Sequence, residues 1–102
     1  MIVITGAMVA RPDKFDEALR LGIEHSRRSR AERGCIAHNV HVDAENRLRL
    51  VFVEEWEDAD SVRAHFARPE SLDFVRRYRK LAATREPMKI YDTAEIGIET
   101  LV

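Results

Sequence analysis

Hydrophobic residues recur along this chain at two spacings: about every second residue, as in strands, and about every third or fourth residue, as in helices. Residues 2–10 are short, β-branched and apolar on both faces, which predicts a buried strand that Arg11 and Pro12 end. Asp13 is placed to cap a helix that runs to Gly34, a residue suited to stopping one. The inward stripe of this helix is expected to comprise Phe15, Leu19, Gly22, Ile23 and Ser26.

The middle of the chain predicts a hairpin of two strands. Residues 35–42 alternate in character, and the polar segment 43–47 is short enough to be the turn. Residues 48–56 predict the returning strand. Because side chains alternate across a strand, one face of this strand carries Leu48, Leu50, Phe52, Glu54 and Trp56.

The last part predicts a second helical region and a final strand. Asp58 is a good N-cap, Pro69 interrupts the helix, and a further helical piece extends to about Ala83. The final strand is expected over 88–98. The order βαββαβ indicates one ferredoxin-like α+β domain over residues 1–102, with the helices on one face of an antiparallel sheet.

The other face of this sheet also carries apolar residues, among them Val51 and Val53 and one of the two apolar faces of the first strand. A small domain with a second apolar sheet face tends to bury it against another copy. We therefore expect a homodimer with two sheets face to face.

Composition excludes several classes of protein. A hydrophobic content of 45% excludes a disordered chain, and 17 basic against 18 acidic residues argue against a nucleic-acid partner. The strand 49–56 carries two carboxylates and lacks the RNA-binding strand motif. The single cysteine, Cys35, forms no internal disulfide, and we find neither a signal peptide nor an apolar run long enough to cross a membrane. The expectation is a cytoplasmic protein.

The candidate chemistry lies where the third strand meets the next helix. Glu54 and Trp56 share a strand face, and a short connection can fold His65 back over it, above an apolar boundary of Leu50 and Phe52. A histidine can act as a general base, and an indole ring can stack on a planar substrate. The structural alternatives are that Trp56 is core and that Glu54 caps a backbone or pairs with an arginine.

Other polar residues are weaker candidates. His38 is either a satisfied core histidine or a second pocket group, and Tyr78 packs against the core or donates a proton. Asn39 is a further substrate-binding candidate, although it shares with His41 the face that a dimer or solvent would cover. Since His38 and His41 point to opposite faces, they cannot chelate one ion, and no metal is expected. His25, between charged neighbours, is expected to be solvated.

These motifs, in this order, resemble the antibiotic biosynthesis monooxygenase family of dimeric α+β barrels over nearly the whole length. The family places Gly-Cys before the second strand, here Gly34-Cys35, and Glu-x-Trp at the end of the third, here Glu54-Glu55-Trp56. A histidine nine residues beyond the tryptophan follows, here His65. The chain departs from the family by carrying His38 where tyrosine is frequent. It also reads Arg68-Pro69-Glu70 where many members have a second histidine.

The resemblance implies a cofactor-independent monooxygenase that uses molecular oxygen on a small phenolic, quinol or polyketide-type aromatic substrate. Two alternatives remain open: a proton-transfer isomerase or lyase of a small metabolite, and a non-catalytic ligand-binding dimer. Haem degradation is disfavoured, because the haem-degrading relatives use an asparagine in strand one, where this chain has Thr5 and Gly6. The sequence contains no glycine-rich phosphate loop of the kind that would indicate a flavin or nicotinamide cofactor.

Overall fold

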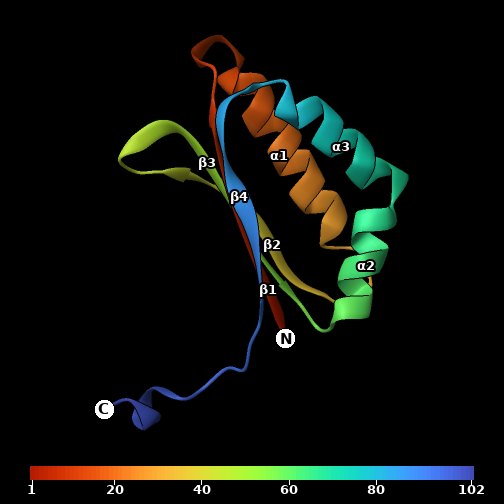
Figure 1. Ribbon diagram of the computed structural model, residues 1–102, viewed down its shortest axis with the longest axis vertical. Coiled ribbons are helices and arrows are strands. Elements are labelled where there is room, and N and C mark those ends of the chain that lie inside the picture. Colours follow the sequence, from red (N-terminus) through yellow and green to blue (C-terminus); the bar gives the residue numbers. More distant parts are fainter.

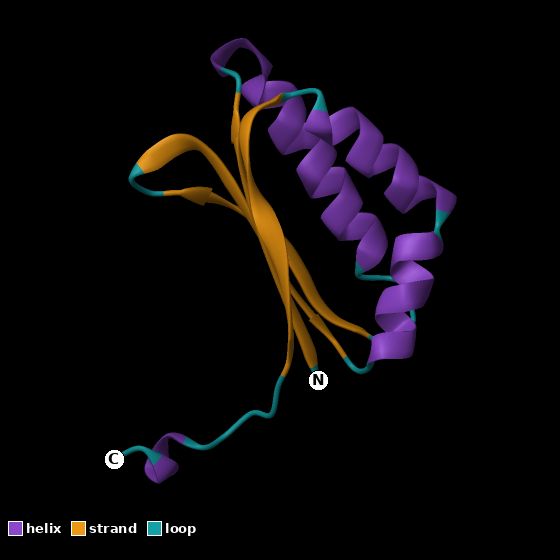
Figure 2. Cartoon of the chain, viewed as in Figure 1, coloured by secondary structure: helices purple, strands orange, loops and turns teal.

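The computed structural model, which covers residues 1–102, is a twisted four-stranded antiparallel sheet with its helices on one face (Figures 1 and 2). The strands lie in the order β2-β3-β1-β4, which confirms the ferredoxin-like α+β fold predicted from the sequence. The elements are β1 (Ile2–Ala10), a 3-10 turn η1 (Pro12–Lys14), α1 (Phe15–Ser29), β2 (Cys35–Asp43), β3 (Asn46–Trp56), α2 (Ala59–Ala67), α3 (Pro69–Arg79), β4 (Ala82–Asp92) and η2 (Ile98–Thr100).

The register of the two central strands decides which side chains face the helices. Ile4 of β1 lies opposite Glu54 of β3, and Met8 lies opposite Leu50. Directly opposed residues of an antiparallel pair point to the same face. These four side chains are at most 5% exposed, so this is the face that the helices cover.

The interior under the helices has two apolar parts. The larger, at the end where the chain enters α1, is aliphatic and consists of Met8, Ala10, Ala18, Leu21, Leu50 and Leu81. The smaller, at the other end of the strands, consists of Ile4, Trp56 and Val62. Between the two parts lie aromatic and histidine rings, which form the site described below.

The buried face of α1 differs from the stripe predicted above. Gly22 and Ser26 are buried as expected, but Phe15, Leu19 and Ile23 are only half-buried. The fully covered positions are Ala18, Leu21, Gly22, His25, Ser26 and Ser29. The helix therefore turns its smallest residues toward the sheet. A Cβ at Gly22 would lie 3.2 Å from the Phe52 ring, so glycine there permits a close approach of helix and sheet.

The helix ends also correct one prediction and support another. Asp13 does not cap α1, because it lies within the 3-10 turn and the N-cap position, Lys14, makes no side-chain bond. Asp58 does cap α2, since its carboxylate accepts a hydrogen bond from the backbone N–H of Ser61 at 2.8 Å. Extended backbone at Arg68, the residue before a proline, separates α2 from α3.

The final strand occupies Ala82–Asp92 rather than 88–98. It begins after the short turn of Lys80 and Leu81 that follows α3, where Ala82 pairs with Ala10. Pro87 is tolerated within this strand for two reasons. First, β4 is an edge strand, where a missing backbone N–H costs little. Second, Pro87 lies between Glu86 and Lys89, the partners of Ala7 and Thr5, where the register of the ladder shifts. The pairing ends when β1 runs out of residues, with the Thr93 N–H bonded to the Met1 carbonyl. The residues after β4 then run away from the sheet (Figure 1).

None of the three helices combines the length and the apolar character that crossing a bilayer requires.

Candidate active site

The candidate active site lies between the sheet and the helices, around the carboxylate of Glu54. The indole N–H of Trp56, two residues further along β3, donates a hydrogen bond to Glu54 Oε1 at 2.9 Å. The Nε2 atom of His38 lies 3.4 Å from the same oxygen, since β2 pairs His38 directly with Glu54. His65 reaches it from α2, with Nε2 at 4.0 Å. The β3 carboxylate is thus the point on which three ring nitrogens converge.

Burial changes the protonation of Glu54. Its side chain is almost wholly covered, and desolvation raises the pKa of the carboxyl from 4.5 to about 7, although the hydrogen bond from Trp56 acts in the opposite direction. Near neutral pH this group therefore exchanges a proton, which is the behaviour of a general acid or base.

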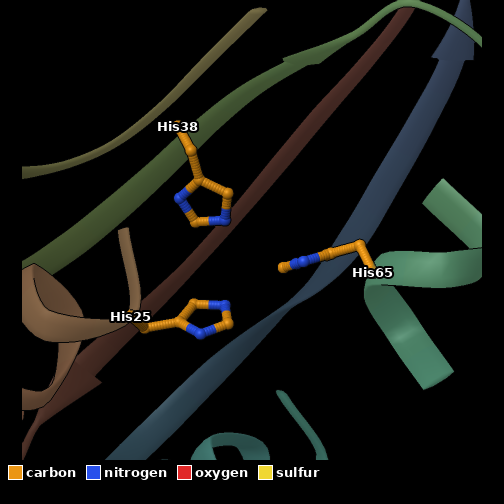
Figure 3. A group of neighbouring side chains, drawn as sticks. All are labelled: His25, His38 and His65. Atoms are coloured by element: carbon orange, nitrogen blue, oxygen red, sulfur yellow. The ribbon is translucent and has the colours of Figure 1, made fainter. Parts of the chain in front are cut away.

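Three histidines from three different elements face one another beside this carboxylate (Figure 3). His25 comes from α1, His38 from β2 and His65 from α2, and each is at most 5% exposed. The ring centroids are 5.1 Å apart for His25 and His38, 5.3 Å for His25 and His65, and 5.5 Å for His38 and His65.

A different neighbour holds the Nδ1 atom of each ring. Ser26 Oγ lies 2.8 Å from Nδ1 of His38, Arg28 donates to Nδ1 of His25 at 2.7 Å, and Glu32 Oε1 lies 2.9 Å from Nδ1 of His65. An ionised carboxylate can only accept, so Nδ1 of His65 carries the proton and its Nε2 presents a lone pair. Nε2 of His38 is buried with no hydrogen-bond partner. All three rings thus make their hydrogen bonds through Nδ1.

The three rings are neutral at physiological pH. Burial, followed by repulsion from the other two histidines, lowers the pKa of His25 to about 2, and burial and His65 lower the pKa of His38 to about 3. Burial also lowers the pKa of His65, while its hydrogen bond to Glu32 acts to raise it.

Aromatic side chains close the site on the side of α3. The His25 ring stacks on Phe74 with centroids 4.0 Å apart, and Phe74 stacks in turn on Tyr78 at 4.8 Å. Phe52 makes edge contacts with both His38 and Tyr78. The Tyr78 hydroxyl is buried without a hydrogen-bond partner, and burial raises its pKa. The walls are therefore flat, apolar surfaces.

The structure brings together most of the residues singled out from the sequence. Glu54, Trp56, His65 and His38 are in mutual contact, with Phe52 beside His38 and Tyr78 reached through Phe52. Asn39 stands apart. It pairs with Val53 in the ladder, and its side-chain oxygen accepts a hydrogen bond from Arg30 at 2.9 Å.

Two members of the site were missed. His25 was expected to be solvated, but its side chain is only 5% exposed. The sequence did offer a signal, because His25 follows the buried residues Ala18 and Leu21 by seven and four positions, which places all three on one helix face. Glu32 follows α1 and meets His65, 33 residues later, so no local pattern could have indicated it. His38 and His41 were expected to point to opposite faces of one strand, and His38 is buried whereas His41 is exposed. The histidines that do come together are supplied by three different elements.

The three histidine rings are buried in this conformation, and a surface groove lies elsewhere. A groove of about 600 Å³ lies between the start of α1 and the β2–β3 turn. Its apolar walls include Phe15, Leu19, Val42 and Leu48, and none of the histidines borders it. Its charged lining residues, Asp16, Asp43 and Arg47, are not buried, whereas the histidine site groups buried titratable side chains, so the histidine site is the candidate active site.

Fold and site together define a small α+β domain with a buried histidine–carboxylate centre. Residues 1–77 match the sequence pattern of the antibiotic biosynthesis monooxygenase family, and the chain belongs to that family. An uncharacterized protein of Synechocystis sp. is 32% identical over 94 residues, which is 92% of this chain. The chain spans 64% of that relative's length.

Solved structures show the same fold. A candidate antibiotic biosynthesis monooxygenase from Deinococcus radiodurans superposes with a TM-score of 0.88 at 18% identity, over 94% of this chain and 95% of that one. A conserved protein from Methanosarcina mazei superposes with a TM-score of 0.85 at 23% identity, over 91% and 92% of the two chains.

Proposed function

We propose that this protein is a monooxygenase that oxidises a small phenolic or quinol substrate at the His65–Glu54 centre without flavin, haem or metal. The observation that carries the proposal is the orientation of His65. Glu32 holds its Nδ1, and its Nε2 lone pair faces the interior beside Trp56, whose ring centroid is 4.6 Å away. A base held by a carboxylate next to an aromatic wall suits the deprotonation of a planar phenol.

In the proposed reaction, the substrate hydroxyl gives its proton to Nε2 of His65, and Glu32 stabilises the resulting imidazolium. The electron-rich phenolate then reduces oxygen directly. For a quinol, one oxygen atom of O₂ enters the ring and the other leaves as water, so that quinol and O₂ give a hydroxyquinone and water. The substrate supplies all four electrons, and no external reductant is needed.

The pKa of Glu54 favours a second candidate function. A carboxyl that titrates near pH 7 beside a neutral histidine provides an acid and a base in one site. Such a pair can move a proton between two carbons or oxygens of a small metabolite, which is the chemistry of an isomerase. Oxygen consumption separates the two functions, because isomerisation consumes none.

The test is oxygen uptake by chelator-treated protein with a panel of hydroquinones, naphthols and anthrones. We expect His65→Gln to lower turnover about 10²–10⁴-fold, the range for a general base. His41→Gln is the matched control, since His41 is exposed on β2 outside the site. No oxygen uptake with any member of the panel, or unchanged turnover in His65→Gln, would contradict the proposal.

We also propose that the chain acts as a homodimer through the sheet face that the helices leave open. Val53 lies in the middle of this face, paired with Thr5 on one side and Asn39 on the other, and it is 37% exposed. A partner sheet would cover it. Sedimentation at micromolar concentration should give about twice 11.8 kDa, and Val53→Glu should give the monomer mass. A monomeric unaltered protein would exclude the dimer.

A further inference from the structure

The three histidine rings lie close enough together to surround one metal ion. One ring nitrogen from each of His25, His38 and His65 lies within 4.8 Å of the other two. Some point therefore lies within about 2.8 Å of all three, whereas zinc–imidazole bonds are about 2.0–2.1 Å long. Each ring would move inward by less than about 1 Å, which side-chain rotation can supply.

The neighbours of His65 and His38 support ligation. A metal-bound histidine almost always fixes its other nitrogen on a carboxylate, a carbonyl or a similar partner. Glu32 does this for His65 and Ser26 does it for His38, at 2.9 and 2.8 Å.

Arg28 opposes ligation by the third ring. A guanidinium only donates hydrogen bonds, so Nδ1 of His25 accepts from it and Nε2 of this neutral ring carries the proton. For Nε2 to bind a metal, the proton must shift to Nδ1 and Arg28 must withdraw. Its positive charge also repels a cation. Arg28 is therefore the residue that limits the affinity of the site.

Glu54 completes the ligand set. Its Oε1 atom is 3.4 Å from Nε2 of His38 and 4.0 Å from Nε2 of His65. Three imidazoles with one carboxylate or water suit zinc and other late first-row divalent ions.

We propose that His25, His38 and His65 bind one divalent transition-metal ion, with Glu54 as the fourth ligand, and that this ion inhibits the protein. Binding itself is independent of the proposed function. The inhibition rests on that function, because the metal occupies the Nε2 lone pair of His65 that would accept the substrate proton. Nε2 of His65 can therefore either bind the metal ion or accept the proton of the phenol, but not both at once.

The test is calorimetric titration of chelator-treated protein with Zn²⁺, together with the visible spectrum of the Co²⁺ form. We expect one ion per chain and a four-coordinate cobalt spectrum. His25→Gln and His38→Gln should abolish binding, while His41→Gln should leave it unchanged. Glu32→Gln should weaken it about 10–100-fold, the usual effect of losing such a support. Circular dichroism of each variant verifies the fold.

Arg28→Met supplies a test in the opposite direction. If Arg28 opposes ligation, its replacement removes a positive charge beside the ion and should tighten Zn²⁺ binding about 10-fold or more, which loss of fold cannot imitate. Absence of stoichiometric zinc in both the unaltered protein and Arg28→Met would overturn the site. Oxygen uptake that persists in the zinc-loaded protein would overturn the inhibition alone. Failure of the oxygenase assay would leave the titration result standing, so the two proposals fail separately.

Discussion

The buried histidines make the stability of the fold depend on pH, and His38 allows this to be measured. Its pKa is about 3 in the folded chain against 6.5 in an exposed ring. Because the folded pKa is depressed, the unfolded chain binds the extra proton, and stability is lost as pH falls from 6.5 toward 3. Down to pH 5 this difference spans about 1.5 pH units, which corresponds to about 2 kcal/mol.

The total change in unfolding free energy on acidification also depends on the buried groups beside His38. His25 behaves in the same way and adds a loss of similar size. Glu54 has the opposite sign, because its raised pKa means that the folded chain binds the extra proton between pH 7 and 4.5. Protonation of Glu54 therefore offsets about the loss of unfolding free energy that one histidine causes. The resulting net loss of about 2 kcal/mol is a substantial part of the 5–15 kcal/mol that stabilise a typical domain.

The assay is urea unfolding at pH 7.5 and pH 5.0, at one protein concentration, followed by the fluorescence of the single tryptophan. His38→Gln should reduce the acid-induced loss of unfolding free energy by about 2 kcal/mol. Glu54→Gln should increase it, and His41→Gln should leave it unchanged. If His38→Gln and the unaltered protein lose the same free energy, His38 is not a buried neutral ring and the reasoning fails.

Three further substitutions test the surroundings of the site. Trp56→Phe keeps a ring but removes the donor to Glu54, so we expect chemical denaturation to show a loss of about 1–3 kcal/mol at pH 8, where the carboxylate is ionised, and less at pH 5. Gly34→Ala should lower the thermal midpoint, because φ is 83° and a Cβ would collide with the first turn of α2, whereas Gly6→Ala, with open space around it, should not. Asp58→Ala should cost about 1 kcal/mol through the lost N-cap, and an unchanged midpoint would show that the cap contributes nothing.

The sequence predicted those parts of the molecule whose signals are local. The period of two along β3 placed Glu54 and Trp56 on one face, and the short connection after Trp56 was enough to expect His65 above them. The ferredoxin-like order followed from the alternation of strand and helix periods.

The missed parts depend on packing between distant segments. His25 has polar neighbours in sequence, and it is buried by the close approach of α1 to the sheet and by Phe74 of α3, which stacks on its ring. Glu32 becomes part of the site because the chain turns after α1 toward α2. The start of β4 was misplaced because pairing with β1 outweighs the presence of Pro87 on an edge strand.

The interior places the candidate site between the aliphatic cluster at one end of the strands and the cluster of Ile4, Trp56 and Val62 at the other. Leu50 and Trp56 lie on the same face of one strand, yet the first belongs to the aliphatic cluster and the second to the site. Phe74 and Tyr78 of the site wall also pack against the aliphatic cluster, so a change at either ring affects both the site and the packing of the helices on the sheet. His25 and His38 belong to neither apolar cluster, so replacing them is the way to reshape the site with the least effect on the packing that holds sheet and helices together.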